Sequence, residues 1–172
     1  MRTPARIAKH PIHPMLVPIP IGLWVFSLVC DLVFRFGGGP NWEVVGWYTM
    51  IGGIVGALLA ALPGLVDLLS LPAHVKRIGV AHMALNLTIV ALYVVNAWMR
   101  SDGMSDAALW LSVLSIALLL VSGWLGGHMV YVHRVAVEPE GPSRAQRYEG
   151  PERRRAGAQA AYYGPERRMA MQ

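Results

Sequence analysis

Four long runs of apolar residues dominate the chain, and short polar segments separate them. Each run is close to the ~20 residues that a helix needs to cross the apolar core of a bilayer. The runs are continuous rather than alternating, which favours helices over membrane strands. Because the connections are short, consecutive helices should run antiparallel. The pattern predicts an all-α fold, a transmembrane bundle of up-down-up-down order with four spans at residues 15–34, 47–69, 79–99 and 107–132.

Composition agrees with membrane spans rather than with a soluble core. Of the 172 residues, 55% are hydrophobic and only 15% are charged, against about 25% charged in typical soluble domains. The net charge is +5, and the basic residues lie at span ends and in the C-terminal segment. A membrane surface explains them better than nucleic acid does. We therefore expect the lipid bilayer as a partner and no nucleic acid.

The same basic residues predict the orientation. Thirteen lysines and arginines fall on the side of the two termini, whereas only Arg35 and Arg100 fall on the other side. This bias predicts a multi-pass membrane protein with both termini in the cytoplasm. An aromatic belt is expected at the opposite boundary, formed by Trp42, Trp47, Tyr48, Trp98 and Trp110. The predicted domains are a cytoplasmic N-terminal segment (1–14), the transmembrane domain (15–134) and a disordered, basic cytoplasmic tail (135–172).

Small residues at a spacing of four predict close contacts between helices. Such residues let helix backbones approach each other in lipid, where apolar burial alone does not drive association. They are Gly52, Gly56, Ala60 and Gly64 in the second span, and Gly123 and Gly127 in the fourth.

Ionisable residues gather at the cytoplasmic ends of all four predicted spans. Because alternate helices run in opposite directions, the starts of odd spans and the ends of even spans meet at one face. Cofactor and metal sites in helical bundles are built in this way, from side chains on facing helices. The residues at this level are His10, His13, Asp67, His82 and His128, and Asn86 shares a helix face with His82.

Simpler explanations apply to several of these residues. A histidine at a membrane interface often bonds only to headgroups or water, and Asp67 has Lys76 and Arg77 within reach as ion-pair partners. His74 and His133 lie in a connection and in the tail, where solvation accounts for them.

One charged pair is expected on the opposite side of the membrane. Asp31 and Arg35 are four residues apart at the end of the first span, a spacing that suits an ion pair within one helix. A charge within a span is a candidate for function. Its closeness to the interface and the available partner favour a structural pair here.

Four segments together resemble a known family. They are "HPIHPMLVPIPIGLWVFSLVCDL", "GLVDLL", "AHMALN" and "GWLGGHMVY". Over residues 8–134 the chain resembles the bacterial membrane proteins filed as domain of unknown function 2231. The resemblance implies a four-helix membrane domain but no established activity. Some relatives are associated with Rieske or cytochrome modules, which implies a redox setting and a redox protein partner, although this chain carries no such module. The motif positions that it implies are His10, His13, Asp31, Asp67, His82 and His128.

The histidine-rich end suggests two kinds of bound group, both suited to electron transfer. A haem b needs two axial imidazoles, for which His82 and His128 are the preferred pair and His13 the substitute. A transition-metal ion would instead use His10, His13, Asp67, His82 and His128. The alternative is a non-catalytic structural or partner-binding membrane component, whose polar cluster only fixes helix packing. No catalytic motif stands out, so the sequence leaves open whether the protein is an enzyme.

The approach to the first span, "HPIHPMLVPIP", is unusual because four prolines interrupt it. Each proline lacks a backbone donor and disfavours helix in the residue before it. We therefore expect an extended or kinked segment that lays His10 and His13 across the cytoplasmic mouth of the bundle, as a lid over the polar site.

The C-terminal segment carries a short repeat. "YEGPERRR" at 148–155 is echoed by "YYGPERRM" at 162–169, and the Gly-Pro steps discourage a continuous helix. Two copies are too few for a solenoid, so we expect a disordered tail. Its arginines are candidates for binding anionic lipid, and a solvated tail or a protein partner are the alternatives.

Overall fold

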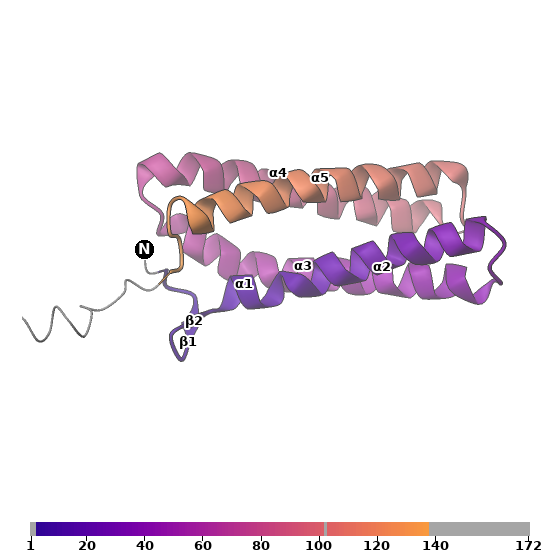
Figure 1. The fold of residues 1–172 in the computed structure, drawn as a ribbon, viewed down its shortest axis with the longest axis horizontal. Helices are drawn as coiled ribbons and strands as arrows, with labels where there is room; N and C mark the ends of the chain where they lie inside the picture. Colours follow the sequence, from indigo (N-terminus) through magenta and orange to yellow (C-terminus); the bar gives the residue numbers. More distant parts are fainter. Residues whose placement is uncertain (1–2, 102, 138–172) are drawn as a thin grey trace, which may run out of the picture. The chain divides into compact units, whose positions relative to one another are not determined.

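The computed structural model describes residues 3–101 and 103–137 as a helical bundle (Figure 1). Four helical segments are long and apolar enough to cross a membrane, namely Ile12–Arg35, Asn41–Leu69, Ala73–Met99 and Asp106–Tyr131. The predicted four-span all-α fold is thereby confirmed. In chain order the elements are β1 (Arg6–Ile7), β2 (His10–Pro11), α1 (Ile12–Leu16), α2 (Pro18–Arg35), α3 (Asn41–Leu69), α4 (Ala73–Met99) and α5 (Asp106–Tyr131).

Local chemistry sets the helix boundaries. The side chain of Ser105 accepts a hydrogen bond from the backbone N–H of Ala108 and so caps the start of α5. The turns after α2 and α4 each contain a glycine at positive φ, Gly37 at +102° and Gly103 at +103°. Residues with a Cβ adopt this conformation at a steric cost, so glycine is suited to both turns.

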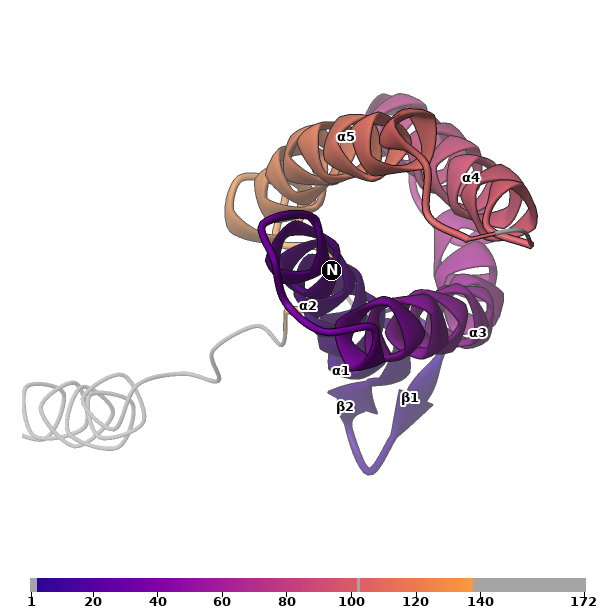
Figure 2. The same cartoon turned by 90° about the vertical axis from the view of Figure 1, so that its right-hand side faces the viewer.

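The helices form two hairpins, α2 against α3 and α4 against α5, which stand side by side. Seen along the bundle axis, they lie in a ring in the order α2, α3, α4, α5 (Figure 2). α2 packs most extensively on α3 and α4 on α5, whereas the seams between the hairpins, α3–α4 and α2–α5, are looser. We call the end where α1 begins and α5 ends the terminal end, and the opposite end the distal end.

The glycines of α3 allow the tight packing of the first hairpin. A Cβ at Gly56 would lie 3.2 Å from the side chain of Ile19 and 3.4 Å from that of Pro20, and one at Gly52 3.3 Å from Leu23. The predicted close contact along α3 is therefore confirmed. The same prediction for Gly123 and Gly127 of α5 is wrong.

Those two glycines of α5 have open space beside them. No atom lies within 4 Å of a Cβ at Gly123, and the nearest atom to one at Gly127 is 4.0 Å away, on Tyr131 of the same helix. The spacing rule failed because this part of α5 borders the looser seam with α2 rather than a tightly packed neighbour.

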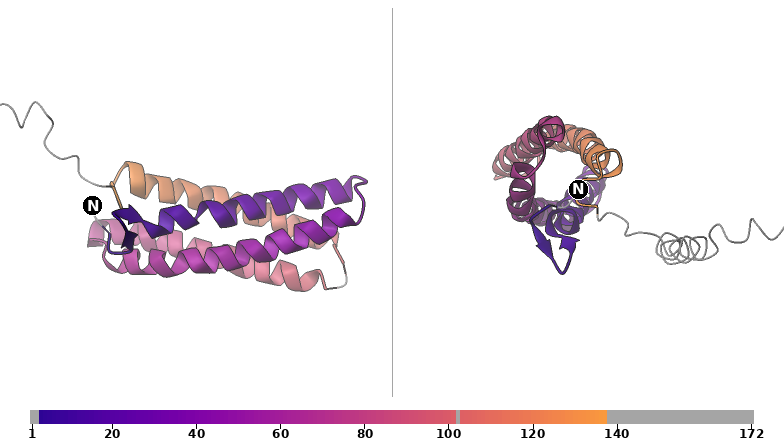
Figure 3. Two further views of the ribbon diagram at one scale, coloured as in Figure 1. Left: turned by 90° about the horizontal axis from the view of Figure 1, so that it is seen from below. Right: turned by 90° about the vertical axis from the view of Figure 1, so that its left-hand side faces the viewer.

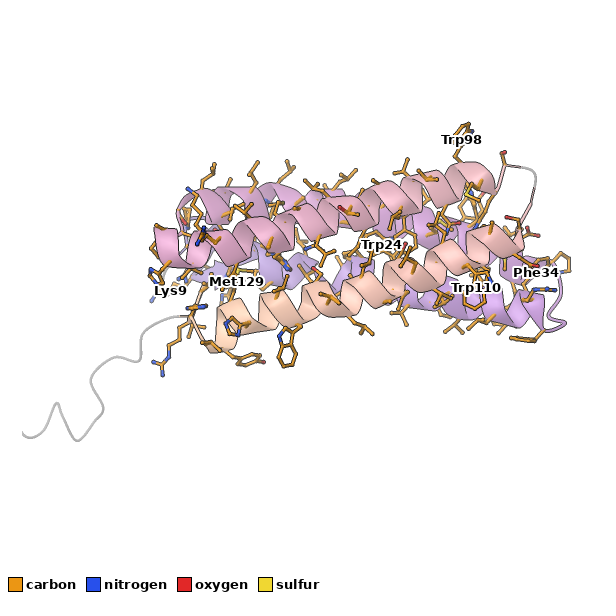
Figure 4. All side chains as sticks on the ribbon, turned by 90° about the horizontal axis from the view of Figure 1, so that it is seen from above. Lys9, Trp24, Phe34, Trp98, Trp110 and Met129 are labelled. Atoms are coloured by element: carbon orange, nitrogen blue, oxygen red, sulfur yellow. The ribbon has the colours of Figure 1, made fainter. Side chains whose placement is uncertain are left out.

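An aromatic stack forms the centre of the core. The rings of Trp24 and Tyr93 are 4.4 Å apart and nearly parallel, and Met50, Ile54 and Ile89 are buried around them. The indole N–H of Trp24 donates to the backbone oxygen of Met50 at 3.2 Å. Figure 4 shows Trp24 near the middle of the bundle's length. This cluster separates the terminal half from the distal half.

A buried polar network joins the helices in the distal half. Both terminal nitrogens of Arg100 donate to the carboxylate of Asp31, at 2.6 and 2.5 Å, and neither side chain is more than 2% exposed. The Arg100 Nε donates to Asn96, and Asn96 and Arg100 both donate to the Ser112 hydroxyl. The network thus connects α2, α4 and α5. α3 can pass close to this network because Gly46 has no side chain. A Cβ at Gly46 would lie 2.8 Å from an Asp31 oxygen.

The expected pairing of Asp31 with Arg35 is wrong. Asp31 pairs with Arg100, while Arg35 reaches Asp106 at the start of α5, at 3.1 Å, with both side chains more than half exposed. A carboxylate in an apolar interior needs a partner that satisfies both oxygens, and the fold brings Arg100 into the bundle to do so.

The outer faces of the helices are apolar. Leucines and valines of all the long helices are exposed there, as contact with a lipid bilayer requires, and Trp98 and Trp110 project outward near the distal end (Figure 4). The predictions for the tail, including its repeat and its arginines, lie outside the described residues.

The buried ion pair should carry a large share of the stability. We expect Asp31→Ala to lower the free energy of unfolding by about 3–5 kcal/mol, because it leaves the Arg100 charge buried and unpaired. Unfolding by sodium dodecyl sulfate, followed by circular dichroism in mixed micelles, measures this loss.

The exposed pair provides the control. Arg35→Ala breaks the contact with Asp106 and should cost less than about 1 kcal/mol, since solvent already screens that pair. Equal losses in the two variants would contradict the structural role that we assign to the buried pair.

Candidate functional site

An apolar cavity of about 380 Å³ occupies the terminal half of the bundle. All five helices contribute to its walls. Trp24 closes it toward the core, and Asp67, Leu71 and Ala136 lie toward the terminal end. Pockets of roughly 300–1,000 Å³ with apolar walls and a few polar groups are typical of small-molecule sites. The polar side chains that line this one are His13, Asp67, His82, Asn86 and Ser122.

The N-terminal segment ties together the elements around the cavity's mouth. Residues of β1 and β2 form a small antiparallel hairpin beside α1 at the terminal end (Figure 3). The backbone N–H of Ala5 donates to the Asp67 carboxylate at 2.9 Å, and Arg6 donates to the backbone oxygen of Ala136 at 3.1 Å. The segment before α1 is therefore bonded both to the end of α3 and to the chain that follows α5.

The proline-rich approach is helical earlier than predicted. His10 and Pro11 are extended, as expected, but helix begins at Ile12 and continues with only a local break at Val17. The helix tolerates Pro18 because it is the first residue of α2, where the missing backbone donor would not be used.

His13 is held against α3 by its ring. Its Nδ1 lies 2.8 Å from the backbone oxygen of Ala60, and a Cβ at Gly64 would lie only 2.8 Å from the same nitrogen. The absence of a side chain at position 64 thus makes room for the imidazole. Because a carbonyl oxygen only accepts, Nδ1 donates, and Nε2 is the ring nitrogen that Ala60 does not use.

His82 is held against α5 in a similar way. Its Nδ1 lies 3.0 Å from the backbone oxygen of Ser122, and its Cε1 would lie 3.2 Å from a Cβ at Gly126. Asn86 donates to the His82 Nε2 at 3.1 Å and to the His82 backbone oxygen at 2.8 Å. The predicted pairing of His82 with Asn86 on one helix face is confirmed.

The two rings meet across the cavity. Their centroids are 6.5 Å apart and their planes stand at 86°, with His13 supplied by α1 and His82 by α4. The two hairpins of the bundle therefore each contribute one imidazole, and both line the same space.

The cavity also opens sideways, at both seams between the hairpins. On the α2–α5 side, Pro18, Ile21 and Gly123 are exposed and line the cavity at the same time. On the α3–α4 side, Leu58 and Leu87 do so. Because these helices are long and apolar enough to span a membrane, both openings face the region that lipid would occupy.

The other predicted ligands lie elsewhere. His10 is exposed, and its ring bonds to the backbone oxygen of Ala8. The ring of His128 lies 5.2 Å from that of His133, whose ring is in turn 6.2 Å from His74. His128 does not line the cavity. Asp67 is 7% exposed and accepts from Ala5 rather than pairing with a cation of the next connection.

The geometry therefore narrows the predicted ligand sets. Within residues 3–101 and 103–137, no group of three or more histidine, cysteine, aspartate or glutamate side chains is placed to hold a metal ion. Among the predicted ligands, the fold brings together the imidazoles of His13 and His82, not the preferred haem pair of His82 with His128. That any of these residues binds a cofactor stays a prediction.

Sequence reasoning missed the groups that orient the two histidines. These are backbone oxygens of Ala60 and Ser122 and the side-chain-free positions Gly64 and Gly126. A glycine spacing of four in α3 was visible, but nothing in the sequence linked Gly64 to His13. The binding of Ala5 to Asp67 was equally invisible, because backbone donors carry no sequence signal.

Comparison with known proteins places the chain in one family. No curated protein and no solved structure matches it. Residues 9–139 match the family model described as "Predicted membrane protein (DUF2231)". That match covers most of the chain and all four spanning helices, so the protein belongs to this family of membrane proteins, a domain of unknown function.

Proposed function

We propose that the protein binds an amphipathic small molecule from the bilayer in the cavity of its terminal half, with the polar head of that molecule at His13 and His82. The observation that carries this proposal is the convergence of two oriented imidazoles, one from each hairpin, in an otherwise apolar space of about 380 Å³. Ligand sites commonly combine apolar walls with a few placed polar groups.

Polar groups inside a membrane bundle support a functional role. Polar side chains in spanning helices carry a desolvation cost and usually mark a ligand or ion pathway. The distal network is satisfied within the protein, since Asp31 and Arg100 bond to each other. His13, by contrast, bonds to the backbone oxygen of Ala60 through one ring nitrogen only, and its side chain lines the same cavity as His82.

The sideways openings favour a ligand that arrives from the lipid. A molecule dissolved in the bilayer reaches the cavity between α2 and α5 without crossing water or unfolding the terminal end. The N-terminal segment is bonded to Asp67 and Ala136 across that end through Ala5 and Arg6, which precede the residues that the sequence predicted as a lid. Beside Gly123, no atom of the described residues lies within 4 Å of the position of a Cβ.

A second candidate function is the binding of haem b or a metal ion in electron transfer, with a redox protein as partner. The supporting observation is that the Nδ1 atoms of His13 and His82 both bond to backbone oxygens. This arrangement orients an imidazole so that Nε2 is the ligating atom. It ranks second because Asn86 already occupies the Nε2 of His82, and because no group of three or more potential ligands is placed to hold a metal ion among the described residues.

The proposal also includes an orientation. Both termini lie in the cytoplasm of a bacterial inner membrane, and the bias of thirteen basic residues to two supports this. The terminal end with its cavity then faces the cytoplasmic leaflet. Binding of anionic lipid by the tail, which lies outside the described residues, stays a prediction.

A bulky side chain inside the cavity should reduce binding. We expect Gly123→Phe to reduce the amount of a co-purified apolar molecule at least tenfold, because Gly123 lines the cavity and the ring takes up space that the ligand needs. Solvent extraction of the protein purified in mild detergent, followed by mass spectrometry, measures that amount.

Gly22→Phe is the matched control for this experiment. Gly22 is an exposed glycine of α2 with no atom within 4 Å of a Cβ, like Gly123, but it does not line the cavity. It should leave the bound molecule unchanged. If both variants and the wild type carry the same molecules at the same level, the cavity is not a binding site and the polar groups only fix helix packing.

Absorption spectra decide the second candidate. If haem b binds, the protein expressed with a haem precursor shows a Soret band that His13→Ala and His82→Ala each remove, whereas His128→Ala leaves it in place. Metal analysis of the same samples tests whether a metal ion binds in the absence of haem. A spectrum without a Soret band and less than one metal ion per ten chains would exclude this function.

The orientation is tested by thiol labelling in intact cells. Cys30 is fully buried and is replaced by serine, and single cysteines are then introduced at Ser70 and Ser101, which are exposed at opposite ends of the bundle. A membrane-impermeant maleimide should label position 101 and spare position 70. The reverse pattern would show that the termini lie outside.

A further inference from the structure

The polar atoms that line the cavity can be divided into hydrogen-bond donors and acceptors. Those that the protein leaves unpaired are mainly acceptors. This inference rests on the proposed function, since it concerns the head group of the same ligand. It depends only on which hydrogen-bonding groups the protein has already used.

The side-chain N–H donors that line the cavity are all engaged within the protein. The Nδ1–H groups of His13 and His82 donate to the backbone oxygens of Ala60 and Ser122. Both N–H bonds of the Asn86 amide are engaged by His82, one at its Nε2 and one at its backbone oxygen. The indole N–H of Trp24 donates to Met50.

One hydroxyl donor remains, that of Ser122. This residue lines the cavity but is only 1% exposed, and its hydroxyl lies 3.1 Å from the His82 Nδ1. Among the described residues that line the cavity there is no lysine and no arginine.

The atoms left over accept hydrogen bonds. No described group bonds to the Nε2 of His13, and this nitrogen is an acceptor in an imidazole whose proton is on Nδ1. The Oδ1 of Asn86 has no donor within the described part of the chain either, because its amide nitrogen faces His82. The carboxylate of Asp67 is an acceptor as well, and the N–H of Ala5 occupies one of its oxygens.

From this balance we propose that the ligand is a long-chain apolar lipid whose head is a hydroxyl group, an alcohol or a phenol. Such a head donates its O–H to the Nε2 of His13 or the Oδ1 of Asn86. A ketone, ester or ether head offers only acceptors and would leave these atoms unpaired, which costs more than the hydrogen bond itself gains. A phosphate head would bring a negative charge to a site without a cation.

A pair of compounds of nearly equal shape isolates the donor. 4-Nonylphenol and 4-nonylanisole differ only in that the second carries a methyl group in place of the hydroxyl hydrogen. Binding of each to the full-length protein in lipid nanodiscs is measured by titration calorimetry, with empty nanodiscs subtracted. The phenol should bind about five- to tenfold more tightly, the factor expected for one hydrogen bond to a buried acceptor.

Two variants separate a specific role from general damage. His13→Phe removes the Nε2 acceptor and keeps a ring in its place, so the preference for the phenol should fall at least threefold. Thr88→Val removes an exposed hydroxyl that bonds to Ala84 and does not line the cavity, and should leave the preference unchanged. Because the two compounds partition into the bilayer in the same way for every variant, that difference cancels when the phenol-to-anisole affinity ratio is compared between variants.

The outcomes distinguish the two proposals. Equal affinity of phenol and anisole for the wild type, with both bound and both blocked by Gly123→Phe, would overturn the hydroxyl head and leave the binding function standing. Binding of neither compound would overturn the hydroxyl head, and together with the absence of a co-purified molecule it would remove the binding function too.

Discussion

The buried pair of Asp31 and Arg100 is the constraint on which the rest of the bundle depends. Two charges in an apolar interior are tolerated only when each oxygen and nitrogen has a partner, so α2, α4 and α5 must meet at one point with little freedom. Gly46 lets α3 approach the same carboxylate. The distal half is therefore closed and fixed in register, and the stack of Trp24 on Tyr93 extends that order to mid-length.

The terminal half is packed less tightly than the distal half. The first hairpin stays tight because glycines of α3 face α1 and α2, while the glycines of α5 face the cavity or open space. The two hairpins are thereby joined at the distal end and separated by a cavity at the terminal end. That asymmetry makes the space in which His13 and His82 meet, and the N-terminal segment covers its end through Asp67 and Ala136.

Much of this could be predicted from residue patterns, and the failures have a common cause. The number of spans, their order and the polar level at one end follow from hydropathy and helix direction, which are local properties. Asp31 with Arg35, Gly123 with Gly127 and His82 with His128 were all inferred from spacing within a helix or from depth alone. Depth and spacing do not determine which way a helix is rotated about its axis, and rotation decides which of two residues at one level face each other.

The sequence by itself determined the class of this protein: four apolar helices, short connections, basic residues concentrated on the side of the termini and polar residues near one face. Only the tertiary structure decided that Asp31 is held by Arg100, that His13 rather than His128 faces His82, and that both rings line one cavity. The reason is physical. The length and hydropathy of a segment depend on that segment alone. The partners of a buried charge or imidazole depend on how each helix is rotated about its axis, and only the packing of all four spans against one another sets that rotation.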